Sequence, residues 1–141
     1  MLPDLSDCVL DHIAIAVKSL DVSQKIWEDL GLKFDPAREV VEDQKVKTAF
    51  AAVDAHAHIE LLEPTSEEST IAKFIANKGE GLHHLCYKVK DVHAKQKELE
   101  AKGYRFIYPA PKLGAGGSLV NFLHPKGTAG VLIEISSGRH S

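Results

Sequence analysis

The chain repeats itself at an offset of 72 residues. Between His12 and Phe34, adding 72 to a residue number leads at eight positions to the identical residue in the second half. The identical pairs are His12/His84, Val17/Val89, Lys18/Lys90, Gln24/Gln96, Lys25/Lys97, Glu28/Glu100, Gly31/Gly103 and Phe34/Phe106. Such a repeat predicts two similar modules. The matched histidines suggest one site that both modules assemble around a pseudo-two-fold axis.

Length, charge and cysteine content exclude several classes of protein. A chain of 141 residues fits one domain, or two small modules that share a core. The net charge of −3 gives no basic footprint for nucleic acid, and no apolar run approaches the ~20 residues that cross a bilayer. The N-terminus lacks a secretory signal pattern, and two cysteines are too few for a disulfide framework. We therefore expect a cytoplasmic protein with reduced thiols that binds neither nucleic acid nor membrane.

Each half is predicted to follow the order β-α-β-β-β. In both halves an N-cap residue, Ser19 or Asp91, opens a helix that a glycine ends, at Gly31 or Gly103. The helices are expected at 19–30 and 91–102. The strands of the first half are expected at 11–17, 32–34, 46–53 and 57–62, and those of the second half at 84–89, 104–107, 119–123 and 130–135.

A helical linker is predicted between the halves. Thr65 and Glu68 have the spacing of a capping box, so the helix is expected to begin there and to run to about Asn77. We expect an α+β fold in a single domain over residues 1–141, with modules at 9–64 and 81–137 and the linker at 65–80. Along the first strand, His12 shares one face with Ala14 and Ala16. Two alanines beside a histidine leave room for a cavity.

The last strand of each half holds a glutamate among aliphatic residues. Glu60 and Glu134 lie 74 residues apart, close to the offset of the two histidines. A carboxylate in an apolar strand is costly unless it is paired, hydrogen-bonded or bound to a cation. Two imidazoles and two carboxylates suit a divalent ion such as Co²⁺, Mn²⁺, Ni²⁺, Fe²⁺ or Zn²⁺. The predicted metal ligands are His12, Glu60, His84 and Glu134.

Two further histidines compete for this site. His83 is adjacent to His84 and therefore faces the other side of its strand. The offset of 72 selects His84. His58 shares the strand face of Glu60, so it is a secondary candidate.

These residues resemble a known family. The repeated modules and the His…Glu…His…Glu order are similar to the vicinal oxygen chelate superfamily, which contains the glyoxalases and bleomycin-resistance proteins. Within it, three segments resemble the methylmalonyl-CoA epimerases: G-L-H-H (81–84), P-K-L-G-A-G-G (111–117) and F-L-H-P-K (122–126). The similar stretches cover nearly the whole chain.

The resemblance implies a fold, a metal site and a reaction. The two modules would form a curved mixed sheet around a metal cavity, with Glu60 at a ligand position that is glutamine or glutamate in such proteins. Co²⁺ is the ion expected first, ahead of Zn²⁺, Mn²⁺ and Ni²⁺. The implied reaction interconverts (R)- and (S)-methylmalonyl-CoA through an enolate. An acyl-CoA is therefore the expected partner, and a homodimer the expected assembly.

The resemblance assigns proton transfer only in part. Some similar epimerases carry a glutamate on the strand after the first helix, proposed as a second proton carrier. Alignment of residues 42–50 places Thr48 there. Glu134 is the candidate catalytic residue for one transfer. Lys88 shares the strand face of His84 and is an alternative, although lysines in such positions commonly extend to solvent.

Substrate-binding candidates cluster around the glycine run at 114–117. This run is either a plain hairpin connection or a loop whose backbone N–H groups contact the ligand. Two flanking lysines could meet coenzyme A phosphates or be solvated surface charges. The candidates are Lys112, Gly116, Gly117 and Lys126.

Two other functions stay open. A lactoylglutathione lyase would use a similar four-ligand centre, and Glu60 in place of glutamine favours that reading. The segments at 111–117 and 124–126 favour the epimerase. A non-enzymatic small-molecule-binding protein of the superfamily needs no metal, so four intact ligand types argue against it.

Overall fold

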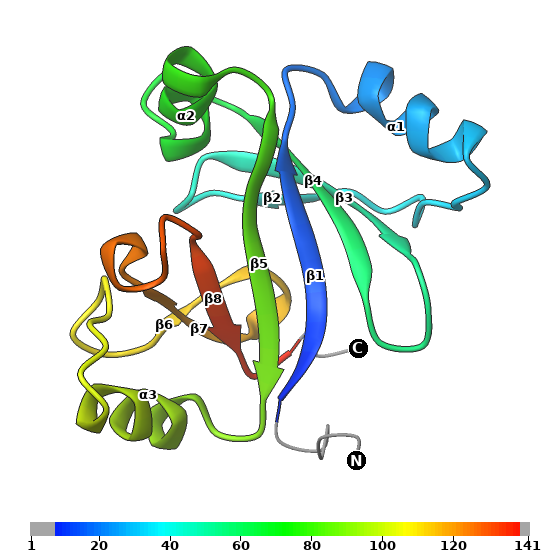
Figure 1. The fold of residues 1–141 in the computed structure, drawn as a ribbon. Coiled ribbons are helices and arrows are strands. Elements are labelled where there is room, and N and C mark those ends of the chain that lie inside the picture. Colours follow the sequence, from blue (N-terminus) through cyan, green and yellow to red (C-terminus); the bar gives the residue numbers. More distant parts are fainter. Residues whose placement is uncertain (1–7, 139–141) are drawn as a thin grey trace. The chain divides into compact units, whose positions relative to one another are not determined.

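Both halves of the chain fold into the same order of elements. The computed structural model describes residues 8–138. The first module contains β1 (Cys8–Ala16), α1 (Leu20–Asp29), β2 (Glu39–Val41), β3 (Val46–Ala52) and β4 (His58–Pro64). The second contains β5 (Gly81–Val89), α3 (Val92–Ala101), β6 (Lys112–Leu113), β7 (Leu119–Leu123) and β8 (Ile133–Ser136). Helix α2 (Thr70–Lys78) joins them, so the predicted α+β class with two βαβββ modules is confirmed (Figure 1).

The two units of the chain have sheets of matching topology. Residues 12–83 form one compact unit, and residues 84–138 with 8–11 form the other. In the first, the strand order is β2-β3-β4-β1, with β1 parallel to β4 and the other pairs antiparallel. In the second, the order is β5-β8-β7-β6, with β5 parallel to β8 and the other pairs antiparallel. Each sheet therefore has a single parallel pair in the same place.

In the first unit a different helix packs on each face of the sheet. Helix α1 is capped by the Ser19 hydroxyl as predicted, and it packs Leu20 and Trp27 against the face that carries Ile13 and Ile15. Helix α2 packs Ile71, Phe74 and Ile75 against Ala14 and Ala16 on the other face. Both alanines are fully buried, and the linking helix packs on them.

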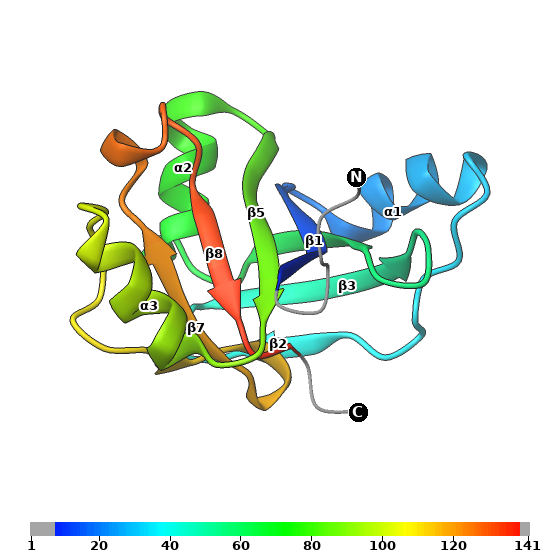
Figure 2. The same ribbon diagram turned by 60° about the horizontal axis from the view of Figure 1, so that its bottom comes forward.

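In the second unit, α3 lies along the sheet (Figure 2). The Asp91 carboxylate caps it by accepting a hydrogen bond from the backbone N–H of Ala94 at 3.0 Å. Its side chains Val92 and Leu99 pack on the face that carries Leu123 and Ile135. The helix ends before Gly103, whose φ of +98° is a conformation that favours glycine.

The linking helix begins later than predicted. Pro64 still belongs to β4, and the backbone N–H of Thr65 continues that pairing by donating to the Lys45 carbonyl at 2.9 Å. The Glu68 carboxylate binds the Lys45 ammonium group and so does not complete a capping box. Ser69 is the N-cap, and its hydroxyl accepts from Ile71 N at 3.1 Å. None of the helices within residues 8–138 is long and apolar enough to cross a membrane.

The prediction of a short strand directly after α1 and directly after α3 is wrong. Phe34 and Phe106 each form only an isolated bridge, with Ala51 and Leu123 respectively. Pro36 follows the first bridge and has no N–H to continue a ladder. The second strand of each module lies later instead, at β2 and β6.

A buried amide network fixes the chain between α3 and β7. Asn121 is fully buried, and its side-chain NH₂ donates to the Gln96 side-chain oxygen at 2.7 Å and to the Tyr108 carbonyl at 3.0 Å. Its side-chain oxygen accepts from the backbone N–H groups of Tyr108 and Phe122, at 3.2 and 2.8 Å. Gln96 also donates to the Pro109 carbonyl at 3.0 Å. One side chain therefore satisfies three backbone groups of this region.

Replacing Asn121 by alanine should destabilise the protein by about 3 kcal/mol, because buried donors and acceptors lose their partners. Urea unfolding followed by circular dichroism measures the change. Asn77→Ala is the matched control, since Asn77 is exposed at the end of α2 and its removal should cost less than about 0.5 kcal/mol. Equal midpoints for the two variants would contradict the role of the network.

Candidate active site

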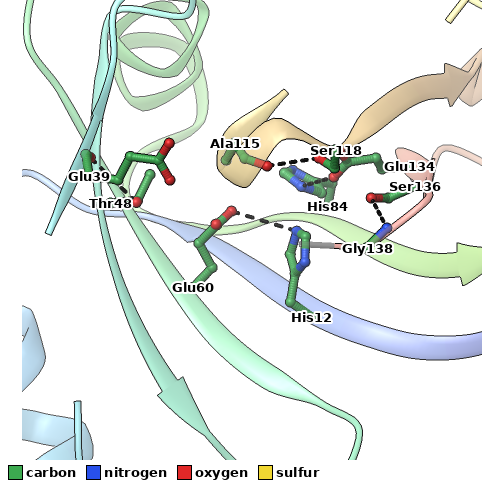
Figure 3. A network of polar contacts seen from close by, with 10 residues as sticks. All are labelled: His12, Glu39, Thr48, Glu60, His84, Ala115, Ser118, Glu134, Ser136 and Gly138. Atoms are coloured by element: carbon green, nitrogen blue, oxygen red, sulfur yellow. Dashed lines mark hydrogen bonds and ion pairs between the residues drawn. The ribbon is translucent and has the colours of Figure 1, made fainter. Parts of the chain in front are cut away.

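The first unit buries one histidine beside one glutamate. His12 lies on β1 and Glu60 on β4, two strands that pair in parallel with Ala14 opposite Glu60. The exposed fractions are 8% for His12 and 5% for Glu60. The His12 Nε2 and Glu60 Oε1 atoms are 3.6 Å apart (Figure 3). The glutamate that the sequence singled out is thus adjacent to the predicted histidine.

The second unit contains the corresponding pair. His84 on β5 and Glu134 on β8 lie on parallel strands with Cys86 opposite Glu134. Their exposed fractions are 6% and 7%, and His84 Nε2 is 2.9 Å from Glu134 Oε1 (Figure 3). In each unit, the glutamate faces the residue that lies two positions after the histidine on the neighbouring strand. The strand registers of the two pairs are therefore the same.

Each pair has an aromatic ring beside it that the sequence analysis missed. Phe50 is the cross-strand neighbour of Glu60, and its ring meets the His12 ring edge-on, with centroids 6.3 Å apart. Phe122 is the neighbour of Glu134, and its ring meets the His84 ring edge-on at 5.6 Å. Adding 72 to 50 gives 122, so extending the repeat beyond Phe34 would have found both rings.

The donor atoms of the two pairs are suited to a divalent ion. Each unit offers one imidazole nitrogen and one carboxylate oxygen, and the Nε2 atoms of His12 and His84 are both buried. Two neutral imidazoles and two carboxylates together balance a charge of +2 and suit first-row metals. The edge-on phenyl rings restrict rotation of the imidazoles, which favours a fixed ligand geometry.

The two competing histidines differ in their surroundings. His83 turns toward α2, where its ring meets the Phe74 ring edge-on at 4.9 Å. It therefore lies away from the His84–Glu134 pair, as strand alternation requires. His58 pairs with His12 across β1 and β4 and is half-buried against Phe50, at 5.9 Å between ring centroids. His58 thus lies beside the first pair, on the same sheet face.

The proposed substrate-binding residues lie on strand β6 and on two separate turns of the second unit. Gly116 and Gly117 form a 3₁₀ turn in the β6–β7 hairpin, with φ values of +65° and +75° that favour glycine. Lys112 is exposed on β6, and its ammonium group lies 4.1 Å from the centroid of the Tyr108 ring. Lys126 is exposed in the 3₁₀ turn Pro125–Gly127. These positions leave both lysines accessible to an anionic ligand.

Thr48, which stands where some similar epimerases have a glutamate, and Lys88, the alternative proton carrier, differ in their surroundings. Thr48 is buried on β3, and its hydroxyl lies 3.4 Å from the Glu39 carbonyl, to which it donates. Lys88 is exposed, and its methylene groups pack against Gly138, where an added Cβ would lie 2.8 Å from Lys88 Cε. The lysine side chain therefore extends along the surface toward the end of β8, as lysines in such strand positions commonly do.

Comparison with known proteins places the chain in a family. Residues 11–122 match the family model of the Glyoxalase/Bleomycin resistance protein/Dioxygenase superfamily. The match covers most of both modules, so the chain belongs to this superfamily. The family resemblance inferred from the sequence is confirmed.

Individual relatives agree over most of the chain. The mitochondrial methylmalonyl-CoA epimerase of Dictyostelium discoideum is 39% identical over 129 residues, covering 89% of this chain and 76% of that protein. The solved methylmalonyl-CoA epimerase of Mycobacterium tuberculosis has a TM-score of 0.89 and 36% identity, covering 100% of this chain and 94% of that one. The Streptomyces coelicolor epimerase, solved with 2-nitronate-propionyl-CoA, has a TM-score of 0.85 and 36% identity, covering 94% and 96%. The chain is therefore similar in sequence and fold to epimerases of acyl-CoA thioesters.

The Phe122 ring should hold the His84 imidazole in its orientation. In Phe122→Leu, the His84 ring signals in NMR spectra should shift and broaden, because the edge-on contact is lost. Phe74→Leu is the matched control, since Phe74 contacts His83. It should perturb the His83 signals and leave those of His84 in place. Unchanged His84 signals in Phe122→Leu would show that the ring does not restrict the imidazole.

Proposed function

We propose that His12, Glu60, His84 and Glu134 bind one divalent metal ion and that the protein is a methylmalonyl-CoA epimerase. The observation that carries the proposal is the occurrence of two buried histidine–glutamate pairs in the same strand register, one in each module. The donor set fits the group, since it is neutral overall with a +2 ion and contains no thiolate. We propose Co²⁺ first, with Zn²⁺, Mn²⁺ or Ni²⁺ as alternatives.

The substrate follows from the relatives and from the chemistry of the donors. Relatives named as methylmalonyl-CoA epimerases support methylmalonyl-CoA as the substrate. Its thioester and carboxylate oxygens suit a divalent ion, and its α-proton is acidic. A divalent ion held by these four residues would supply Lewis-acid chemistry, which would polarise the thioester carbonyl and make the α-proton easier to remove. The nitronate in the Streptomyces complex is a planar, charge-delocalised anion, as an enolate is. This likeness supports an enolate in the proposed reaction.

Other tasks would fall to further residues of this chain: they would orient the ligands, exclude water, transfer protons and bind the substrate. Phe50 and Phe122 hold the two imidazoles in orientation, and the apolar strands around the glutamates keep water away. We assign one proton transfer to a carboxylate oxygen of Glu134, acting as a general base toward one epimer and as its acid in reverse. We assign Lys112 and Lys126 to coenzyme A phosphates and the N–H groups of Gly116 and Gly117 to polar contacts with the ligand.

Two further aspects are proposals of the same kind. A homodimer is expected by resemblance. A cytoplasmic location is expected from the sequence, although the Dictyostelium relative is named as mitochondrial. Neither affects the chemistry assigned to the four ligand residues. A lactoylglutathione lyase is the second candidate function, favoured by Glu60 at the variable ligand position.

Metal retention distinguishes the two neighbouring histidines. His84→Ala should lower bound Co²⁺ by at least roughly tenfold, because loss of a ligand or its support typically costs 10–100-fold in affinity. His83→Ala is the matched control and should retain the metal, since His83 faces Phe74. Equilibrium dialysis followed by elemental analysis measures both. Equal losses in the two variants would show that His84 is not a ligand.

Exchange of the α-proton tests the reaction. In D₂O, the wild-type protein loaded with Co²⁺ should convert (R)-methylmalonyl-CoA to a mixture of epimers that carry deuterium at the α-carbon. Mass spectrometry and chiral analysis of the released acid measure label and configuration. A hemithioacetal of glutathione is the parallel substrate. If the protein converts this hemithioacetal and does not exchange the α-proton of methylmalonyl-CoA, the proposed epimerase function is wrong and the lyase function is favoured.

A further inference from the structure

Arg105 and His124 lie side by side beyond the end of β7. The backbone N–H of His124 donates to the Arg105 carbonyl at 2.8 Å. One step along the two segments, Phe106 and Leu123 form an isolated bridge, and both pack in the hydrophobic cluster of α3. Because successive side chains of an extended chain point to opposite faces, Arg105 and His124 belong to the other face of the sheet.

That face also carries the His84–Glu134 pair. Phe122 precedes His124 by two residues and lies opposite Glu134, so all three share one side of the sheet. The pairings of β8 with β5 and β7 place His84 and His124 at the same level, two strand spacings or about 10 Å apart. Arg105 lies one spacing further out, about 5 Å. All of these residues belong to one compact unit.

The turn that follows His124 orients its ring. The Nδ1 atom accepts a hydrogen bond from the backbone N–H of Lys126 at 3.3 Å. The proton of the neutral ring therefore lies on Nε2, which donates to no other group within residues 8–138. The turn is itself packed, because the Tyr104 ring lies 3.8 Å from the place that a Cβ on Gly127 would take. The ring thus presents a fixed N–H donor to a ligand.

The Arg105 guanidinium carries a charge that no carboxylate of residues 8–138 balances. Arg38 in the first unit, by contrast, pairs with the Asp21 carboxylate at 2.8 Å. Arg105 is exposed, and the planar fork of a guanidinium matches the oxygens of a phosphate group. An unpaired arginine beside an oriented imidazole is therefore suited to a phosphate.

The equivalent turn of the first unit has the opposite charge. Subtracting 72 from Lys126 leads to Asp54. The Asp54 carboxylate accepts hydrogen bonds from the backbone N–H groups of Ala57 and His56, both at 2.8 Å. These bonds hold the pKa of Asp54 below its usual range, so this carboxylate is ionised at neutral pH. The repeat therefore does not account for the cationic turn of the second unit.

We propose that Arg105 and His124, together with Lys126, bind the diphosphate of the coenzyme A substrate, an inference that rests on the proposed epimerase function. The guanidinium and the Nε2–H group donate to phosphate oxygens, and the lysine adds positive charge. The diphosphate is joined to the thioester by the long pantetheine arm, so the two groups bind at separate points. Arg105 and His124 lie in line with His84 but away from it, as this geometry requires. They select coenzyme A thioesters over shorter ones.

A substrate without phosphates tests this assignment. Methylmalonyl-N-acetylcysteamine keeps the thioester and the carboxylate but lacks the diphosphate. With methylmalonyl-CoA, Arg105→Ala and His124→Asn should each lower kcat/KM roughly tenfold to a hundredfold through a higher KM, the scale of one hydrogen bond to a charged group. With the shorter thioester, both should match the wild type, because there is no phosphate contact to lose. Asparagine keeps an acceptor at the place of Nδ1, so His124→Asn preserves the turn.

Lys97→Ala is the matched control. It removes an equal charge from an exposed position of α3, the helix that packs on the other face of the sheet. This variant should act on both thioesters like the wild type. Equal losses on both thioesters in Arg105→Ala, or no loss on either, would overturn the phosphate contact.

Binding of free coenzyme A separates this inference from the proposed reaction. In isothermal titration, Arg105→Ala should bind coenzyme A roughly tenfold to a hundredfold more weakly than the wild type. Dephospho-coenzyme A keeps the diphosphate, so the same loss should appear with it. A loss confined to coenzyme A would overturn the diphosphate in favour of the 3′-phosphate. If the wild type epimerises neither thioester, the proposed function fails, and the titration still decides whether Arg105 contacts a phosphate.

Discussion

Burial of two carboxylates in apolar strands is the constraint on which the rest of the structure depends. Glu60 and Glu134 are among the buried residues of their sheets, and the strands around them are aliphatic. Removing an ionised carboxylate from water costs several kcal/mol even after relaxation, and apolar replacements of buried ion pairs are often more stable. A fold selected for stability alone would place leucines here. Two such pairs, each beside an imidazole, therefore indicate that stability has been given up for a function.

The two modules share individual hydrogen bonds at equivalent positions. Asp35 N donates to the Phe50 carbonyl and Ile107 N to the Phe122 carbonyl, both at 2.8 Å. The offset of 72 thus persists through β3 and β7. It becomes 74 at Glu60 and Glu134, so two residues have been added in the connection from β7 to β8. That connection holds the 3₁₀ turn Pro125–Gly127, and the strand register of the glutamates absorbs the insertion without change.

The features that could be predicted from the sequence have local causes. Those that could not be predicted depend on residues that are distant in the sequence. Ser19, Asp91 and the glycines after the helices act through neighbouring backbone groups, so their roles could be read directly. The capping box at Thr65 failed because Lys45, distant in sequence, engages both Thr65 and Glu68. Strands of two or three residues, such as β2 and β6, carry no periodicity of their own. Their positions follow from the strands they pair with.

The same frame carries different chemistry at its two outer strands. Glu39 lies opposite Thr48, and Lys112 lies opposite Val120, the residue 72 positions after Thr48. Equivalent places thus hold an acidic residue in one module and a basic residue in the other, while each module keeps its histidine and its glutamate, on β1 and β4 or on β5 and β8. A symmetric ion needs matched ligands, but an acyl-CoA has a reacting carbon at one end and phosphates at the other. In the proposed function, this divergence of the outer strands would suit an unsymmetrical substrate, because the Lys112 ammonium group is assigned to the phosphates at one end of the acyl-CoA.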